Sequence, residues 1–204
     1  MPVRSRLDPL RDVKGEPPAR EGRVIAPNAD YAALIAGIAA TPARLEALVA
    51  STARDAWTRR PDNGGFSLLE HVCHLRDIDA DGYCQRVERI LTEAWPDLPE
   101  IDGDALAEQR DYQNLDLMEA LTSFCCTRRQ LVRRLSGLVP AERCRAGRLA
   151  GHLEVTIEGL VHFMLAHDRE HLCQLEALCT GSIRVATPGN RAVIRPDAPS
   201  KTSR

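Results

Sequence analysis

Hydrophobic side chains recur at intervals of three and four residues along four long stretches of the chain. The stretches run from about Ala29 to Ala53, from Ser67 to about Ala94, from Asp116 to about Ser136 and from Val155 to Thr180. This spacing places the apolar side chains on one face of a helix, which must then be buried. We find no strand pattern of any length. The sequence therefore predicts an all-α protein, a four-helix bundle.

Several residues mark where these helices begin, end or are interrupted. Ser67 followed by Glu70 fits a capping box, in which the hydroxyl accepts a backbone N–H and the carboxylate reaches back to the cap. Gly181 follows the last helix in the position of a C′ glycine. Pro42 lies inside the first stretch, where it either kinks one helix or marks a fresh start.

The remaining segments lack this periodicity. Residues 1–27 hold several prolines and alternating charge, and we expect a flexible arm there. Residues 182–204 are expected to form a flexible tail, which leaves 28–181 for the bundle. Between the second and third long helices we expect a loop and a short helix at Asp104 to Tyr112. Because this connection is longer than a tight turn, a simple up-down-up-down order is not required.

Composition narrows the classes of function. The chain has 204 residues and a formal net charge of −2 at pH 7, which gives no electrostatic reason to expect binding to nucleic acid or an anionic membrane. No run approaches the roughly 18 apolar residues of a membrane span. No secretory signal is visible. The seven cysteines are odd in number and form no C-x-x-C, so we expect a cytoplasmic protein with reduced thiols, mostly small buried hydrophobic side chains.

Histidines on the apolar faces are the candidate chemistry. His167 and His171 are four residues apart in the last helix, so their side chains lie nearly one above the other. The second helix offers His74 or His71 as a third ligand. Three neutral imidazoles and a water would make an open metal site of the catalytic type. The alternative interpretation is that these are core histidines satisfied by hydrogen bonds.

Acidic and thiol side chains lie close to these histidines in sequence. The carboxylates could orient the imidazoles by accepting their outer N–H groups, and they are Asp77, Asp79, Asp168 and Glu170. The neighbouring thiols of Cys73 and Cys173 are offset around the helix by about 100° or 200°, so we expect them to have packing roles.

Two further patterns have less weight. The third helix carries Arg128, Arg129, Arg133 and Arg134, which we interpret as a solvated helix face. Residues 167–171, HDREH, match the inverted zincin pattern H-x-x-E-H. That pattern also requires a glutamate ligand well downstream, and the sequence contains no glutamate beyond Glu176. We therefore set the protease interpretation aside.

At this point the sequence resembles a known family. The resemblance rests on Phe66-Ser67 at the start of the second helix, on HVCHLRD at 71–77, on HDREHL at 167–172 and on the linker from Ile90-Leu91 through LPEIDGD at 98–104. In order and separation these segments are similar to the DinB-like/YfiT-like superfamily of metal-binding four-helix bundles. The resemblance covers about Ala29 to Thr180.

The resemblance implies an up-down-down-up bundle, often a homodimer, with a divalent metal on three histidines. It implies His74, His167 and His171 as the metal ligands, and leaves His71 one turn away to line the pocket or to support a ligand. Members with known activity include S-transferases and isomerases that use small cellular thiols such as bacillithiol or mycothiol. Zinc, nickel, iron and manganese all accept imidazole, so the metal is not specified.

We therefore predict a metal-dependent enzyme that activates a thiol or water, S-transferase-like, acting on a small-molecule thiol or another small substrate. The alternative from another functional class is a non-catalytic metal- or ligand-binding bundle that serves a stress response. A bundle whose histidines only pack in the core is the third hypothesis.

Overall fold

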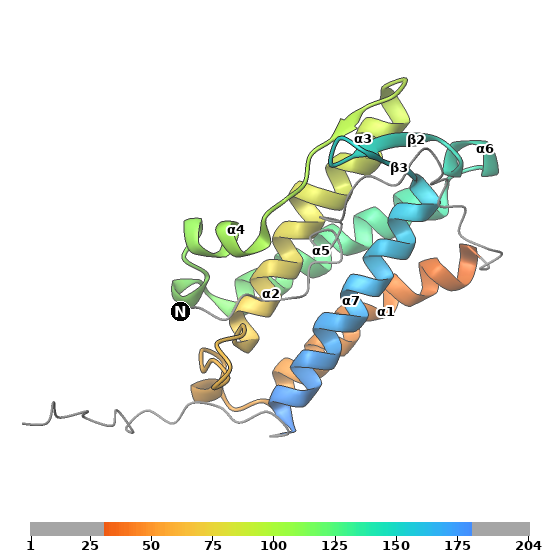
Figure 1. Ribbon diagram of the computed structural model, residues 1–204. Coiled ribbons are helices and arrows are strands. Elements are labelled where there is room, and N and C mark those ends of the chain that lie inside the picture. Colours follow the sequence, from red (N-terminus) through yellow and green to blue (C-terminus); the bar gives the residue numbers. More distant parts are fainter. Residues whose placement is uncertain (1–30, 181–204) are drawn as a thin grey trace, which may run out of the picture.

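The computed structural model describes residues 31–180. Four long helices pack side by side in a bundle (Figure 1). They are α1 (Tyr31–Ser51), a second helix composed of α2 (Leu68–Asp77), the π-helical segment η2 (Ile78–Cys84) and α3 (Gln85–Thr92), then α5 (Leu117–Ser136) and α7 (Ile157–Cys179). The predicted four-helix bundle is confirmed. The arm at 1–27, the tail at 182–204 and Gly181 lie outside the described residues.

Shorter elements connect the long helices. They are η1 (Arg54–Ala56), β1 (Asp97–Leu98), α4 (Gly103–Gln109), η3 (Tyr112–Asn114), α6 (Pro140–Arg143), β2 (Ala146–Leu149) and β3 (Leu153–Thr156). The strands form a small sheet at one end of the bundle, in which β1 is parallel to β2 and β2 is antiparallel to β3. The expectation of no strands was wrong, because strands of two to four residues are too short to show an alternating pattern.

Contacts between helix ends establish the up-down-down-up order. Tyr31 at the start of α1 donates a hydrogen bond of 3.1 Å to the carbonyl of Leu135 at the end of α5. The later halves of α1 and α7 are joined by the Arg44–Glu176 ion pair. Gln113, just before α5, donates to Ser67 at the start of α2. Thus α1 and α7 run in one direction, and the second helix and α5 run in the other.

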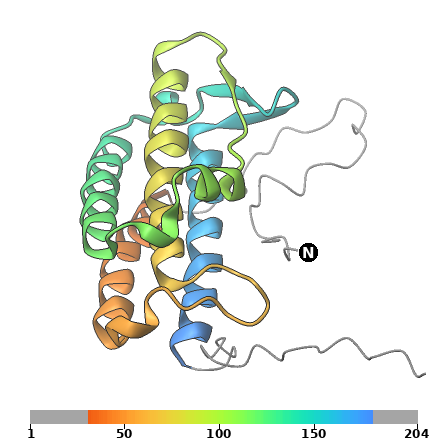
Figure 2. The same ribbon diagram turned by 90° about the vertical axis from the view of Figure 1, so that its left-hand side faces the viewer.

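The connection between α3 and α5 follows from this order. Because the two helices are parallel, residues 93–116 must return along the second helix, which at 1.5 Å per residue is roughly 38 Å long. This segment, here called the crossover, carries β1, α4 and η3. Figure 2 shows it running down the outside of the bundle beside α2. The short helix expected at Asp104 to Tyr112 corresponds to α4, which lies in the crossover.

The hydrophobic core is divided into two clusters with a polar layer between them. Along α7, Leu165 belongs to one cluster and Leu172 to the other. His167, Asp168 and His171 lie between these two leucines and are buried as well. The buried polar groups of α7 therefore lie between the two hydrophobic clusters.

The first helix is more apolar than we expected from the sequence. By length and composition alone α1 could cross a membrane, so the expectation that no stretch approaches this composition was wrong. Many of its residues are alanines, which raise its hydropathy without long side chains. In the bundle α1 buries one face, which carries Leu34, Ile38, Leu45 and Val49, and leaves its alanines exposed. Pro42 lies within the unbroken helix, so it does not mark a fresh start.

The cysteines differ from the expectation. All seven are free thiols, but only Cys73 and Cys125 are buried. Cys84 is half-buried and the other four are exposed. The expectation of mostly buried thiols was therefore wrong, as was the packing role for Cys173, which lies on the outer face of α7. The packing role of Cys73 is confirmed, because it lies in the core with Leu69 and Val72.

Candidate metal centre

The start of α2 directs two histidines into the core. Ser67 caps the helix: its Oγ accepts a hydrogen bond from the Glu70 N–H at 3.3 Å, and the Glu70 carboxylate accepts from the Ser67 N–H at 2.9 Å. Arg60 holds the same carboxylate from the adjoining loop, with an Nε–Oε2 distance of 2.9 Å. The predicted capping box is thus present. Because the helix begins at this point, His71 and His74 both face inward and are buried.

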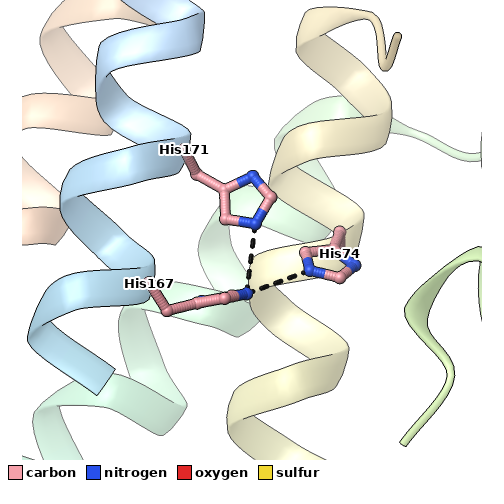
Figure 3. A group of neighbouring side chains, drawn as sticks. All are labelled: His74, His167 and His171. Atoms are coloured by element: carbon pink, nitrogen blue, oxygen red, sulfur yellow. Dashed lines mark hydrogen bonds between the residues drawn. The ribbon is translucent and has the colours of Figure 1, made fainter. Parts of the chain in front are cut away.

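The last helix supplies the other two histidines. Thr156 caps α7, with its Oγ1 accepting from the Gly159 N–H at 3.0 Å. From this start, His167 and His171 lie one turn apart on the face toward α2, each 2% exposed. Figure 3 shows the two imidazoles projecting from α7 toward His74 on α2.

The Nε2 atoms of three histidines converge on one point. The distance between His74 Nε2 and His167 Nε2 is 3.1 Å, and that between His171 Nε2 and His167 Nε2 is also 3.1 Å. Nitrogens bound tetrahedrally at 2.0–2.1 Å from a metal lie about 3.3 Å apart. A neutral His167 Nε2 has either one proton or one lone pair, so it cannot make a full hydrogen bond to each neighbour. The arrangement therefore fits three ligands of one cation.

The environment keeps these imidazoles neutral, as metal ligation requires. Burial lowers the pKa of His74, His167 and His171 well below the usual value, and each is lowered further by the neighbouring histidines. The nearby positive charge of Arg128 also lowers the pKa of His167. At neutral pH the described residues thus present three uncharged nitrogen ligands without a fourth His, Cys, Asp or Glu ligand, as in the open type of site.

His71 lies outside this group and contacts the rear of one member. Its Nδ1 is 2.9 Å from Nδ1 of His171, the ring nitrogen that faces away from the other two histidines. Burial lowers the pKa of His71 to about 4, although the Glu70 carboxylate opposes the shift. A neutral His71 can therefore accept the Nδ1 proton of His171 and fix the orientation of that ring.

His74 is held by packing on its outer side. Its buried Nδ1 has no hydrogen-bond partner among residues 31–180. Gly103, the first residue of α4, lies against the ring so closely that a Cβ there would be 2.4 Å from Cε1 of His74. The Phe66 ring packs on the same histidine, with 5.6 Å between the ring centroids. The crossover thus covers this side of the site.

The acidic residues expected to orient the histidines have other partners. Asp77 accepts hydrogen bonds from Tyr112 at 2.7 Å and from Arg76 at 2.6 Å. The carboxylates of Asp79 and Asp168 both bind Arg128. The expectation that these three aspartates orient the histidines was therefore wrong, because their oxygens accept hydrogen bonds from arginines and a tyrosine.

Arg128 was also misassigned. Its side chain is 1% exposed, so it belongs to the core and not to a solvated face. Arg133 and Arg134 on the same helix are exposed, as expected. The periodicity of α5 contained the signal, because Arg128 follows buried Phe124 by four residues and precedes buried Leu131 by three.

With this geometry established, comparisons with known proteins identify the family. A family model described as the DinB superfamily matches residues 11–175. The chain belongs to the DinB superfamily. The family predicted from the histidine segments is thereby confirmed. A comparison with curated protein sequences gave no match.

Among solved structures, YfiT from Bacillus subtilis is similar to this DinB chain. It is described as a probable metal-dependent hydrolase with an unusual four-helix bundle topology. The match has a TM-score of 0.69 at 20% sequence identity and covers 74% of this chain and 87% of the other. At this identity the likeness shows that the two proteins share a fold. The DinB bundle described here and YfiT thus have the same helical architecture.

Proposed function

We propose that this DinB protein binds one divalent metal ion through the Nε2 atoms of His74, His167 and His171, and uses it to activate a water or a small thiol. The observation that carries the proposal is the convergence of these three buried nitrogens, with His167 Nε2 lying 3.1 Å from each of the other two. A bound metal would lower the pKa of such a nucleophile and polarise a carbonyl of the substrate.

The protein's own residues prepare the site. Burial keeps the three imidazoles neutral, so no proton must leave before they bind a cation. His71 is within hydrogen-bonding distance of the outer nitrogen of His171, and Gly103 and Phe66 pack on His74. These contacts fix the rings and exclude water from their outer sides, which strengthens electrostatic interactions in the site.

The finer assignment is an S-transferase-like reaction with a small cellular thiol, acting in a reducing cytoplasm as a homodimer. The free state of all seven cysteines is consistent with such a compartment. Hydrolysis, in which water takes the place of the thiol, is favoured instead by the description of YfiT. The metal is zinc, nickel, iron or manganese, since each accepts imidazole ligands. The second candidate function is metal or ligand binding without turnover.

Metal analysis of protein purified without a histidine tag tests the proposal. We expect about one equivalent of divalent metal in the wild type and a loss of it in His74→Ala and His167→Ala, with helicity retained. His152→Ala is the matched control, because His152 is exposed and its Nδ1 donates to the Ala150 carbonyl at 2.8 Å, away from the three ligands. A wild type that neither contains metal nor is stabilised by added zinc, nickel, iron or manganese would contradict the proposal.

Assays of the metal-loaded protein separate the reaction classes. Turnover of electrophilic substrates only when a small thiol is present would support transfer to sulfur. Turnover of esters or amides without thiol would support hydrolysis. Stoichiometric metal with no turnover in either panel would favour the binding function.

A further inference from the structure

Four buried polar residues form a cluster in the layer between the two hydrophobic clusters. They are called the Arg128 cluster here and comprise Thr41, Asp79, Arg128 and Asp168. Each comes from a different long helix: α1, the η2 segment of the second helix, α5 and α7 respectively. None is more than 1% exposed. The cluster is thus a contact point common to all four helices.

The guanidinium of Arg128 uses every N–H group that it has. Its Nε and NH2 donate to Asp79 at 2.7 and 2.8 Å, which makes a bidentate pair. NH2 also donates to Asp168 at 2.9 Å, and NH1 donates to the other oxygen of the same carboxylate. The last N–H, on NH1, reaches the Ile38 carbonyl at 3.2 Å. A planar fork with five bonds has one orientation, so the positions of both carboxylates are fixed by it.

Further contacts hold the two ends of the cluster. Thr41 donates from Oγ1 to Asp168 at 2.6 Å, which ties α1 to the same carboxylate. The guanidinium lies over the ring of Phe124, one turn earlier on its own helix, with 4.9 Å from Cζ to the ring centroid. Stacking of this kind restricts the side chain to one position.

The two aspartates belong to the helices that carry the histidines. Asp168 is the residue after His167 on α7, and Asp79 is five residues after His74 on the second helix. Arg128 therefore connects the helix of one candidate ligand to the helix of the other two. A rotation or shift of either helix that moves the histidines apart must also break bonds to the guanidinium.

Stability alone does not account for such a cluster. Removing one guanidinium and two carboxylates from water carries a large cost, and apolar residues of similar size often support a fold equally well or better. A buried ionic group is better explained where it selects one arrangement of helices among several that pack similarly.

We propose that Arg128 is a positioning residue for the metal site, and that its bonds to Asp79 and Asp168 set the distance and rotation between the helix carrying His74 and the helix carrying His167 and His171. The inference rests on the proposed function, because it assigns a role in holding the metal ligands. It predicts that the cluster can be removed without loss of the fold but not without loss of the site geometry.

Replacement of the cluster by apolar residues tests this inference. In the triple variant Asp79→Leu, Arg128→Met and Asp168→Leu, we expect a metal-free melting temperature at or above that of the wild type. Titration with Co²⁺ should show affinity reduced about tenfold or more, with altered d–d absorption bands, because the three nitrogens no longer converge. The matched control is Arg44→Met with Glu176→Leu, which removes a surface connection between α1 and α7 and should leave the Co²⁺ spectrum unchanged.

The single variant Asp79→Asn serves if the triple variant does not fold. This variant keeps the Arg128–Asp168 ion pair, whose two charges cancel, and disrupts only the bidentate pair with the second helix. We therefore expect the same reduced Co²⁺ affinity and altered absorption bands. A folded variant that binds Co²⁺ with wild-type affinity and spectrum would overturn the positioning role alone. A wild type that does not bind Co²⁺ or the other divalent ions would overturn the proposed function as well.

Discussion

The unusual feature at the scale of single residues is that an imidazole faces the outer nitrogen of a candidate ligand. A histidine ligand more commonly donates its second N–H to a carboxylate or a backbone carbonyl. Here Nδ1 of His171 meets Nδ1 of His71 at 2.9 Å. A neutral partner increases the basicity of His171 less than a carboxylate would, but it fixes the ring equally well and adds no negative charge to the core.

Removal of His71 should weaken metal binding without abolishing it. In His71→Ala we expect one equivalent of metal to bind with about 10–100-fold lower affinity, because His171 loses the acceptor that orients its ring. His71→Asn should recover most of the loss, since its side-chain oxygen can accept the same proton. Competition titration with a chelating dye would measure both affinities, and an unchanged affinity in His71→Ala would show that packing alone orients His171.

Residue patterns in the sequence located the candidate ligands but not their neighbours. The i, i+4 pair His167 and His171 needs only the helical repeat to be recognised. Facing helices leave both His71 and His74 as candidates for the third ligand, and only the family resemblance favoured His74. Arg128 could be recognised as buried from its phase in α5, but not its partners. Asp79 and Asp168 are 49 and 40 residues away in sequence, and only the packing of the whole bundle brings them together.

At the scale of elements, the crossover is the part that the parallel arrangement of α3 and α5 requires. It is fixed to the second helix where Tyr112 donates to Asp77 at 2.7 Å and where Arg110 pairs with the same carboxylate at 2.8 Å. Between these bonds and β1, the start of α4 lies on His74. An element needed for chain connectivity thereby also closes one side of the candidate metal site.

A methyl group at the start of α4 should disturb the site. In Gly103→Ala the new Cβ would lie 2.4 Å from Cε1 and 2.9 Å from Nδ1 of His74, so the ring or the helix must move. We expect a loss of about 1–3 kcal/mol in the free energy of unfolding and weaker metal binding. Urea denaturation and metal titration would measure the two effects.

Gly137→Ala provides the control for this substitution. A Cβ at Gly137 would meet its nearest neighbours at 3.7 Å, which is ordinary contact, and the residue has a right-handed helical backbone. Stability should be unchanged or slightly higher there. If Gly103→Ala and Gly137→Ala had the same free energy of unfolding and metal affinity, α4 would be able to move away from the new methyl group and would not fix His74.

Local sequence determined which elements were predictable. Ser67 and Glu70 interact within one turn, so the start of α2 could be read directly from the sequence. The hairpin of β2 and β3 could not, because its four-residue strands depend on pairing with each other and on the left-handed turn residues Ala150 and Gly151. Strands this short have little intrinsic preference, and their conformation is set by tertiary contacts.

At the scale of the whole molecule, the polar layer makes the stability of the metal-free protein sensitive to pH. The pKa of His71 is lowered by burial to about 4, and those of the three candidate ligands are also lowered. Below pH 6.5 the unfolded chain therefore binds protons that the folded chain does not, and protonation favours unfolding. Each such proton contributes a slope of about 1.4 kcal/mol per pH unit.

We therefore expect the free energy of unfolding of the metal-free protein to fall between pH 6.5 and 5, where most carboxylates remain ionised. Urea denaturation at intervals of half a pH unit would measure it. The decline should be shallower in His71→Ala, because that variant lacks one of the histidines whose pKa burial lowers. A free energy independent of pH over this interval would mean that the folded protein accommodates the protons.

The burial of the three histidines, of which His74 lies under the crossover, also has a kinetic consequence. An ion bound among side chains that are 2–4% exposed can leave only when part of the fold opens. Local opening of the crossover, more than the strength of the metal–nitrogen bonds, would then set how long an ion stays. Strong chelators would then remove the ion slowly, at a rate that does not depend on their concentration.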